Sequence, residues 1–338
     1  MISPHTPLEA DLVLSGGGVK GIGLAGSVVA LMEAGYAIQR VSGTSAGSIV
    51  GAIVAAGSDQ LTPEQVEQIT ITLPYRKFLD PTHLTGIPLL GPAWGVLSET
   101  GIYKGDFAHD WIQSQLKNLG VRTFGDLAYD DESLQPEQRY KLVVTAADVT
   151  TGQLVRLPWD YQRIYGLDPD EQQVADAVRA SMSIPFFFQT AKLTSTSGLT
   201  STLVDGGLLS NFPIDSFDRR DGKLPRWPTF GVTLLPNLPE GNDKVIPALA
   251  PLNWVFGGPP LIEELITTMI VGRDQAYLNQ PWVSARAIRV DSTDVGFLDF
   301  NIPKQQMQGL YQRGYDATEA FLSTWNWTNY LDRFRRPG

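Results

Sequence analysis

A serine between two glycines, Gly43-Thr44-Ser45-Ala46-Gly47, constrains the fold of this chain more than any other feature. It follows a short apolar run at residues 38–42 and precedes a run of small residues, 46–56, with helical spacing. This Gly-x-Ser-x-Gly pattern is typical of a nucleophile elbow, a sharp turn from strand to helix that exposes the serine hydroxyl above the sheet edge. Gly43 and Gly47 provide the space for that turn. Taken alone, the same five residues also fit a plain glycine-rich turn.

The preceding stretch repeats the same strand-to-helix order. Residues 11–15 form a short apolar run that is broken by Gly16-Gly17-Gly18, and residues 19–34 then have helical spacing. Two such units in succession predict parallel strands joined by a right-handed crossover, and therefore an α/β sheet covered on both faces. Further helices are expected at residues 62–73, 107–119, 174–180, 261–279 and 304–325, and further strands at 140–149, 153–157, 202–204, 230–235 and 285–290.

Length and composition limit the partners. The chain has 338 residues, a net charge of −10, a pI of about 4.8 and no cysteine. We expect one domain across 1–338 with a core at about 11–325. The net negative charge argues against nucleic acid as a partner, because its phosphates bind clustered lysine and arginine. The N-terminus has no signal-peptide pattern, and no apolar run is long enough to span a bilayer, so a cytoplasmic location is expected.

Two stretches rich in proline and glycine, residues 75–101 and 236–260, are expected to be irregular insertions. They also carry apolar side chains such as Trp94, Trp254 and Phe256. They fit well-packed loops, and they also fit a mobile apolar cover over a site, in contact with lipid or an acyl chain. A transient membrane contact would have to use such side chains, because the chain offers no basic patch.

The positions of the histidines restrict the chemistry at Ser45. Of three histidines, only His5 precedes Ser45, and none follows His109. The usual orders of a serine–histidine–acid triad therefore fail. A serine still needs a base, and a buried carboxylate is the remaining choice. Asp205 is the best candidate because it ends an apolar strand and is followed by Gly206-Gly207, so we expect it at the C-terminal sheet edge. Asp148, also at a strand end, is the second candidate.

The glycine loop admits two interpretations. Backbone N–H groups of Gly16, Gly17 and Gly18, at a turn that opens a helix, can stabilise an oxyanion. The same loop also fits the Gly-x-Gly-x-x-Gly fingerprint of a dinucleotide site. The second strand lacks the expected acidic residue, but Arg40 could suit the 2′-phosphate of NADP, so an NADP-binding oxidoreductase remains an alternative. The acidic clusters near residues 130 and 170 lack the ligand spacing of a calcium site, and no metal is expected.

The chain resembles the patatin-like phospholipase family. The resemblance rests on Gly16 to Gly21, Gly43 to Gly47 and Asp205-Gly206-Gly207, in the family's order, with weaker similarity at residues 123–127, 180–185 and 211–213. It implies a three-layer α/β/α fold with a mainly parallel central sheet and a Ser–Asp dyad without histidine. Ser45 would be the nucleophile, Asp205 the base, and Gly16, Gly17 and Gly18 the oxyanion loop.

The expected function is a serine acyl hydrolase that cleaves lipid or other carboxylic esters through an acyl-enzyme, without a metal or cofactor. A non-catalytic binding protein with the same fold is the remaining alternative. The two insertions vary widely in proteins of this kind, so the resemblance does not identify the ester.

Overall fold

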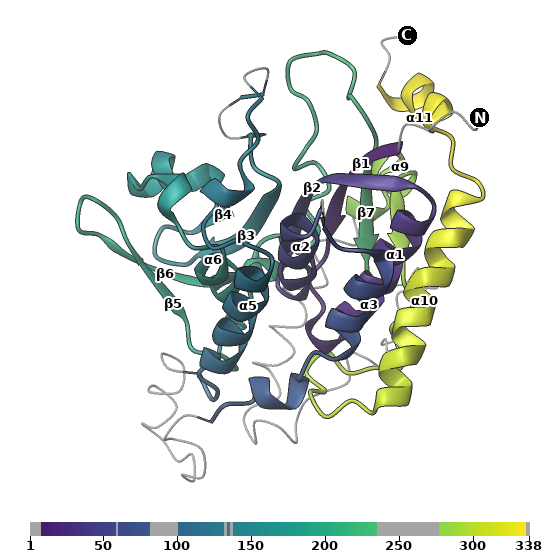
Figure 1. The fold of residues 1–338 in the computed structure, drawn as a ribbon. Helices are drawn as coiled ribbons and strands as arrows, with labels where there is room; N and C mark the ends of the chain where they lie inside the picture. Colours follow the sequence, from purple (N-terminus) through teal and green to yellow (C-terminus); the bar gives the residue numbers. More distant parts are fainter. Residues whose placement is uncertain are drawn as a thin grey trace.

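The protein is built around one twisted sheet. The structure is a computed structural model that describes residues 8–58, 60–81, 101–131, 134–135, 138–234 and 277–335. The sheet has eight strands in the order β5-β6-β3-β2-β1-β7-β8, with β4 also paired to β3 (Figure 1). The strands are β1 Leu8–Leu14, β2 Tyr36–Thr44, β3 Leu142–Asp148, β4 Gln153–Leu157, β5 Ala191–Thr194, β6 Thr200–Asp205, β7 Thr229–Thr233 and β8 Ala287–Arg289.

The predicted mainly parallel sheet is confirmed. β1 pairs in parallel with β2 and β7, β2 with β3, and β7 with β8. Antiparallel pairing is confined to β4, β5 and β6 on one side of the sheet. The strand prediction at 153–157 is confirmed. Strand β5 was not predicted, because its segment Ala-Lys-Leu-Thr is short and has little apolar character.

Helices surround the sheet. They are α1 Ile22–Glu33, α2 Ala46–Ala56, α3 Pro63–Ile71, α5 Asp106–Asn118, α6 Val174–Ser181, α9 Pro281–Ser284, α10 Lys304–Leu322 and α11 Trp327–Phe334. Shorter helical turns are η1 Gly18–Gly21, η2 Tyr75–Phe78, η3 Gly125–Leu127, η5 Tyr161–Tyr165, η6 Pro169–Glu171 and η7 Gly206–Leu208. A capping box begins α3: the Gln65 N–H donates to Thr62 Oγ1, and the Thr62 N–H donates to the Gln65 side chain.

Alternate residues of the strands point to opposite faces, and both faces are covered. Leu12 and Leu14 of β1 belong to the larger apolar core, which includes residues of α1, α2 and α10. Val13 belongs to a second core that contains Val143 and residues of the segments 212–217 and 278–287. Because the side-chain period of a strand is two, this division shows that apolar groups are buried on both sides of the sheet. The predicted arrangement of a sheet flanked by helices is therefore confirmed.

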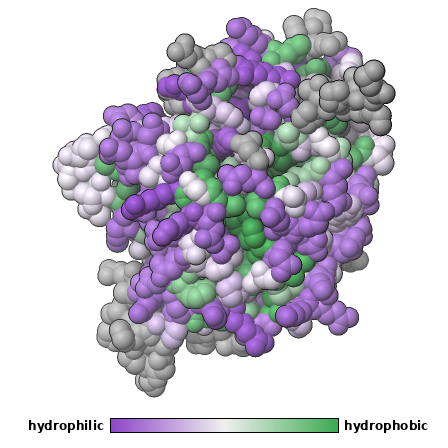
Figure 2. All heavy atoms as spheres, viewed as in Figure 1, coloured by the Kyte–Doolittle hydropathy of each residue, from purple (hydrophilic) through white to green (hydrophobic). Residues whose placement is uncertain are grey.

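Helix α2 lies at the centre of one face. Every residue of α2 is buried, as expected for a helix that is apolar on all sides. Figure 1 shows α2 between α5 and α1, and Figure 2, from the same side, shows apolar atoms gathered in the middle of a mostly hydrophilic surface. None of the helices in the described ranges combines the length and the apolar character needed to cross a membrane.

Parts of the sequence predictions fall outside the described residues. They include most of the insertion 75–101, all of 236–260, and most of the helix predicted at 261–279. The predicted helix at 304–325 is α10, which ends at Leu322 and is followed by α11. Helix α11 was not predicted.

Helices α1 and α10 approach so closely that glycine is required at the contact. A Cβ atom on Gly314 would lie 1.9 Å from the carbonyl oxygen of Gly23, and one on Gly26 would lie 2.0 Å from that of Tyr311. Ser27 donates a hydrogen bond across the same contact to the Gly314 carbonyl. By contrast, Gly309 of α10 is exposed, with no atom near its would-be Cβ.

We therefore expect opposite effects from two alanine substitutions in α10. Gly314→Ala should lower the free energy of unfolding by about 3 kcal/mol, because the helices must separate. Gly309→Ala should raise it by up to about 1 kcal/mol, because alanine favours the helix. Urea denaturation of both variants measures the difference, and equal effects would contradict the close helix contact.

Candidate functional site

Ser45 lies in a strained turn between β2 and α2. Its backbone has φ 52° and ψ −122°, a conformation that non-glycine residues rarely adopt. A Cβ atom on Gly43 would lie 2.4 Å from the Gly47 carbonyl oxygen, and one on Gly47 would lie 2.3 Å from that of Leu14. The two glycines are thus required by the close approach of β2, α2 and the end of β1.

Hydrogen bonds hold the strained turn on both sides of Ser45. The Ser45 N–H donates to Ser181 Oγ at 2.8 Å. The Ser45 carbonyl accepts from the N–H and the hydroxyl of Ser48, at 2.9 and 2.6 Å. Such strain persists only where surrounding contacts determine the conformation, and it is concentrated at functional sites.

Asp205 reaches this turn by a route that the sequence prediction had wrong. We expected its strand to end at the C-terminal edge of a parallel sheet, but β6 runs antiparallel to β3. Strand β3 continues past Thr145, the partner of Thr44, and β6 returns along this extension until Asp205 pairs with Ala146. The end of an antiparallel strand therefore comes level with the end of β2.

The turn after α6 contacts both residues. Ser181 accepts the Ser45 N–H, and the Ser183 carbonyl accepts the Asp205 N–H at 2.9 Å. Neither serine was assigned a role from the sequence, although both lie in the segment 180–185 that resembles the family. The available signal was the position of Ser181 and Ser183 directly after the helix predicted at 174–180.

The Asp205 carboxyl is buried with few partners. Its Oδ1 accepts the Gly207 N–H at 2.8 Å, whereas Oδ2 has no well-aligned hydrogen bond with a described residue. Burial raises the pKa of Asp205 to about 7, and the nearby Ser45 hydroxyl and the Gly207 N–H oppose this rise. Catalytic hydrogen bonds are often poorly aligned before substrate binds. The carboxyl group thus has the proton affinity of a base that works near neutral pH.

Asp148 is held in a different way. Its Oδ1 accepts the N–H groups of Thr150 and Thr151, and its Oδ2 accepts the Tyr165 hydroxyl. Burial favours the neutral form, but hydrogen bonds from Ser201, Tyr165 and Thr151 together hold the pKa of Asp148 below its ordinary value. Asp148 therefore stabilises the turn between β3 and β4 and is poorly suited to accept a proton.

The glycine loop lies directly against Ser45. A Cβ atom on Gly16 would lie 3.0 Å from Ser45 Cβ, and Gly18 has φ +56° with the Phe297 carbonyl 2.0 Å from its would-be Cβ. The Gly16 N–H donates to the Asn211 carbonyl, and Asn211 Nδ2 donates to the Gly16 carbonyl, both at 3.3 Å. Asn211, which was named only in a weak similarity, therefore fixes one end of the loop. The Gly17 and Gly18 N–H groups make no hydrogen bond with any described residue.

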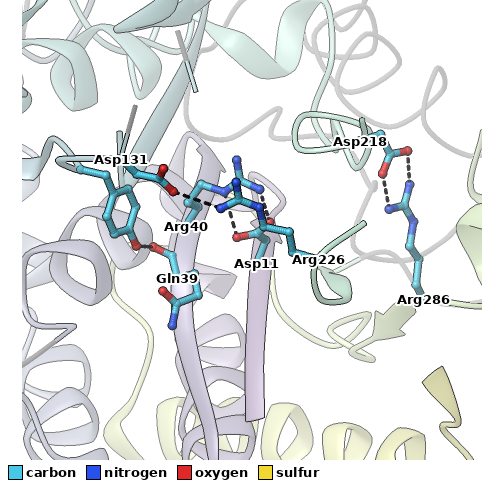
Figure 3. A network of polar contacts seen from close by, with 8 residues as sticks. Asp11, Gln39, Arg40, Asp131, Asp218, Arg226 and Arg286 are labelled. Atoms are coloured by element: carbon cyan, nitrogen blue, oxygen red, sulfur yellow. Dashed lines mark hydrogen bonds and ion pairs between the residues drawn. The ribbon is translucent and has the colours of Figure 1, made fainter. Parts of the chain in front are cut away.

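Arg40 is not available to a dinucleotide phosphate. Its Nε and Nη2 donate to the two carboxylate oxygens of Asp11 at 3.0 and 2.6 Å, and both side chains are buried (Figure 3). The guanidinium also lies 4.6 Å from the centre of the Phe217 ring. Arg40 thus links β1 to β2, which removes the residue that supported the NADP interpretation.

No histidine of the described residues lies against Ser45. His5 and His83 lie outside the described residues, and the His109 ring interacts with Asp176 on the surface at 2.8 Å. Within those ranges, no group of three acidic or histidine side chains is arranged to hold a metal ion.

Comparison with known proteins identifies the class of protein. The family model of patatin-like phospholipases matches residues 12–218, and the chain belongs to this family. It is 37% identical over 318 residues to the uncharacterized protein YqhO of Bacillus subtilis (strain 168), covering 94% of this chain and 99% of YqhO. It is also 29% identical over 150 residues to the RpoH suppressor of Rhizobium meliloti (strain 1021), which covers 39% of this chain and 23% of that protein.

Among solved structures, VipD from Legionella pneumophila shares the fold. The TM-score is 0.52 with 19% sequence identity, covering 94% of this chain and 67% of VipD. Membership of the patatin-like phospholipase family supports a lipid acyl hydrolase at the level of the family.

The buried carboxyl of Asp205 should cost stability at alkaline pH. Because its pKa rises from 3.8 to about 7 on folding, the protein must bury a charge above pH 7, at a cost of up to about 4 kcal/mol that disappears as the pH falls toward 4. We expect Asp205→Asn to raise the free energy of unfolding at pH 8, and to raise it less at pH 5.5.

Urea denaturation at the two pH values measures this effect. Asp148→Asn is the matched control, and it should lower stability at both values because the charged form of Asp148 is stabilised by its hydrogen bonds. A stability of Asp205→Asn below wild type at pH 8 would show that the Asp205 charge is not costly.

Proposed function

We propose that this protein is a serine acyl hydrolase that cleaves carboxylic esters of lipids through an acyl-enzyme on Ser45, with Asp205 as the base. The observation that carries the proposal is the buried Asp205 carboxyl, with its pKa raised to about 7, beside a serine in a strained turn. A carboxylate is ordinarily too weak a base for a serine hydroxyl, and burial reduces that mismatch.

In the first half-reaction, Ser45 Oγ attacks the ester carbonyl carbon while its proton passes to Asp205. The carbonyl oxygen becomes an oxyanion, and the N–H groups of Gly17 and Gly18 are the proposed donors because they make no other hydrogen bond with a described residue. The Gly16 N–H already donates to Asn211, so we assign Gly16 to the loop's anchoring. The intermediate collapses, and the leaving alcohol takes the proton from Asp205.

In the second half-reaction, Asp205 takes a proton from water as the water oxygen attacks the acyl carbon. The Ser45 oxygen leaves and regains the proton, and the acid product is released. Both half-reactions use the same carboxyl group, first as base and then as acid. The proposal needs no metal or cofactor, and the organisation as one domain across residues 1–338 with irregular insertions at 75–101 and 236–260 remains a prediction.

The substrate is proposed to be a lipid ester because of the family. The leaving alcohol and the acyl position are left open. Comparison of short monomeric esters with the same esters above their aggregation threshold tests this part. A marked rise in rate with aggregation is expected if the protein acts on a lipid surface, and equal specific rates would contradict it.

The dyad predicts the effect of two substitutions. Ser45→Ala and Asp205→Asn should each lower the rate of p-nitrophenyl ester hydrolysis about a thousandfold or more, because the two groups act as a unit. Asp148→Asn is the carboxylate control and should retain the rate in the folded fraction. Near-normal turnover by Asp205→Asn would exclude Asp205 as the base.

The pH dependence of the ester reaction follows from the pKa of Asp205. Only the deprotonated carboxyl accepts the Ser45 proton, so kcat/KM should rise with pH through about 7. A plateau already reached at pH 5 would contradict the proposed base. Tight binding of NADPH by a protein without ester hydrolysis would instead favour the oxidoreductase.

A further inference from the structure

Phe186 has a backbone conformation that bulky residues rarely adopt. Its φ is 67°, and within the described ranges the only other residue besides glycine with a positive φ is Ser45. A phenylalanine with such a φ is a clear outlier, because its Cβ crowds the backbone where glycine would fit without strain. Strained residues are concentrated at sites that bind or transform a ligand, so this position needs a functional explanation.

The Phe186 ring is not part of an apolar core, unlike the two rings that follow it. Phe187 and Phe188 are each 1% exposed, their ring centres lie 4.8 Å apart, and the Phe187 ring stacks on Phe300 at 5.4 Å. Phe186 is half-buried, belongs to neither apolar core, and makes no ring contact within the described part of the chain. The fold therefore holds an aromatic ring at a strained position without packing it into either core.

Phe186 lies close to the Ser–Asp dyad along the chain. It follows Ser183, whose carbonyl accepts the Asp205 N–H at 2.9 Å, by three residues. Three residues of chain span at most about 11 Å, which limits the distance between the Cα atoms of Ser183 and Phe186. The Phe186 carbonyl also accepts the Ile102 N–H at 3.2 Å. The backbone of Phe186 is thus held between the turn that contacts Asp205 and a second segment.

Two leucines lie equally close to Asp205 along the chain. Leu208 ends η7, three residues after Asp205, and Leu209 follows it. Both side chains are half-buried, and neither belongs to the two apolar cores of the described residues. Apolar side chains that the cores do not use therefore occur on both segments that meet at Asp205. Ligand sites are lined mainly by apolar and aromatic side chains of this kind.

We propose that the Phe186 ring contacts the acyl chain of the ester bound at Ser45, in an apolar site completed by Leu208 and Leu209. This inference rests on the proposed function and deepens it, because it assigns a preference for esters of medium-chain fatty acids over acetate esters. Each methylene group that leaves water strengthens binding about fourfold. The strained backbone conformation holds the ring in the position where it meets the acyl chain.

The ratio of kcat/KM for p-nitrophenyl octanoate to that for p-nitrophenyl acetate tests the proposal. Both esters are assayed below their aggregation thresholds, and the ratio cancels differences in the folded fraction. The wild type should prefer octanoate, and Phe186→Ala should lower the ratio about tenfold, because contact with about two methylene groups is lost. Leu208→Ala should lower the ratio as well, and it keeps the test decisive if Phe186→Ala does not fold.

Phe321→Ala is the matched control. Phe321 is a half-buried phenylalanine of α10, and its ring packs edge-on against Phe230 at 5.6 Å, near the start of β7. Its substitution removes a ring of the same size and exposure class at the opposite edge of the sheet from Ser45. This variant should lose stability and keep the wild-type ratio.

Phe186→Gly separates the ring from the strain of the backbone. It should lower the ratio as much as Phe186→Ala does. It should also unfold at a higher urea concentration than Phe186→Ala, because glycine adopts a φ of 67° without strain. Equal unfolding midpoints of the two variants would show that the backbone is not strained at this position, which would contradict the proposal.

A ratio within about twofold of wild type in folded Phe186→Ala and Leu208→Ala would overturn the proposal. So would a wild type that hydrolyses acetate as efficiently as octanoate. Ser45→Ala separates this failure from that of the proposed function. If Ser45→Ala is inactive on both esters while the Phe186 variants keep the wild-type ratio, only the acyl contact is wrong, whereas an active Ser45→Ala would remove the hydrolase proposal itself.

Discussion

The turn at the end of α6 is the contact on which the geometry of the site depends. Ser181 binds the backbone N–H of Ser45, and Ser183 binds that of Asp205, so one short segment fixes two residues that are 160 positions apart in the sequence. Arg179 donates to the Ser183 hydroxyl at 2.6 Å and to the Gln189 carbonyl at 2.9 Å, which secures the segment in turn. These contacts stabilise the strained backbone conformation of Ser45.

The site also shows how a buried carboxylate can be kept reactive. Asp148 and Asp205 are both buried at strand ends, but Asp148 receives hydrogen bonds on both oxygens, whereas Asp205 has one clear donor, the Gly207 N–H. Their pKa values consequently move in opposite directions, below the ordinary range for Asp148 and to about 7 for Asp205. The difference illustrates a general trade-off, since a carboxyl group with unsatisfied partners destabilises the fold while becoming a better base.

Much of the fold could be predicted from the sequence because local patterns determine it. The glycines at 43 and 47, the apolar strands and the capping box at Thr62 each specify local structure without reference to distant residues. The order of the strands and the antiparallel return of β6 could not be predicted, since pairing depends on contacts between Ala146 and Asp205 that no local pattern encodes. The sequence analysis placed Asp205 near Ser45 as if its strand ran parallel to the others, whereas β6 is antiparallel to β3.

The supporting residues of the site were harder to find for the same reason. Ser181 and Asn211 hydrogen-bond to backbone groups of residues far away in the sequence, and each has an ordinary local explanation, as a helix end or as a loop residue. Burial distinguishes a supporting role in the site from these ordinary local explanations, and the burial of a polar residue is a property of the tertiary structure.

The central claim is that a carboxyl group, without an imidazole, activates Ser45. The rate at which an organophosphonate labels Ser45, measured against pH in wild type and in Asp205→Asn, tests it most directly. We predict that the wild-type rate rises through pH 7 and that Asp205→Asn reacts far more slowly, without that rise. Labelling of Asp205→Asn at the wild-type rate, with the same pH dependence, would contradict the claim.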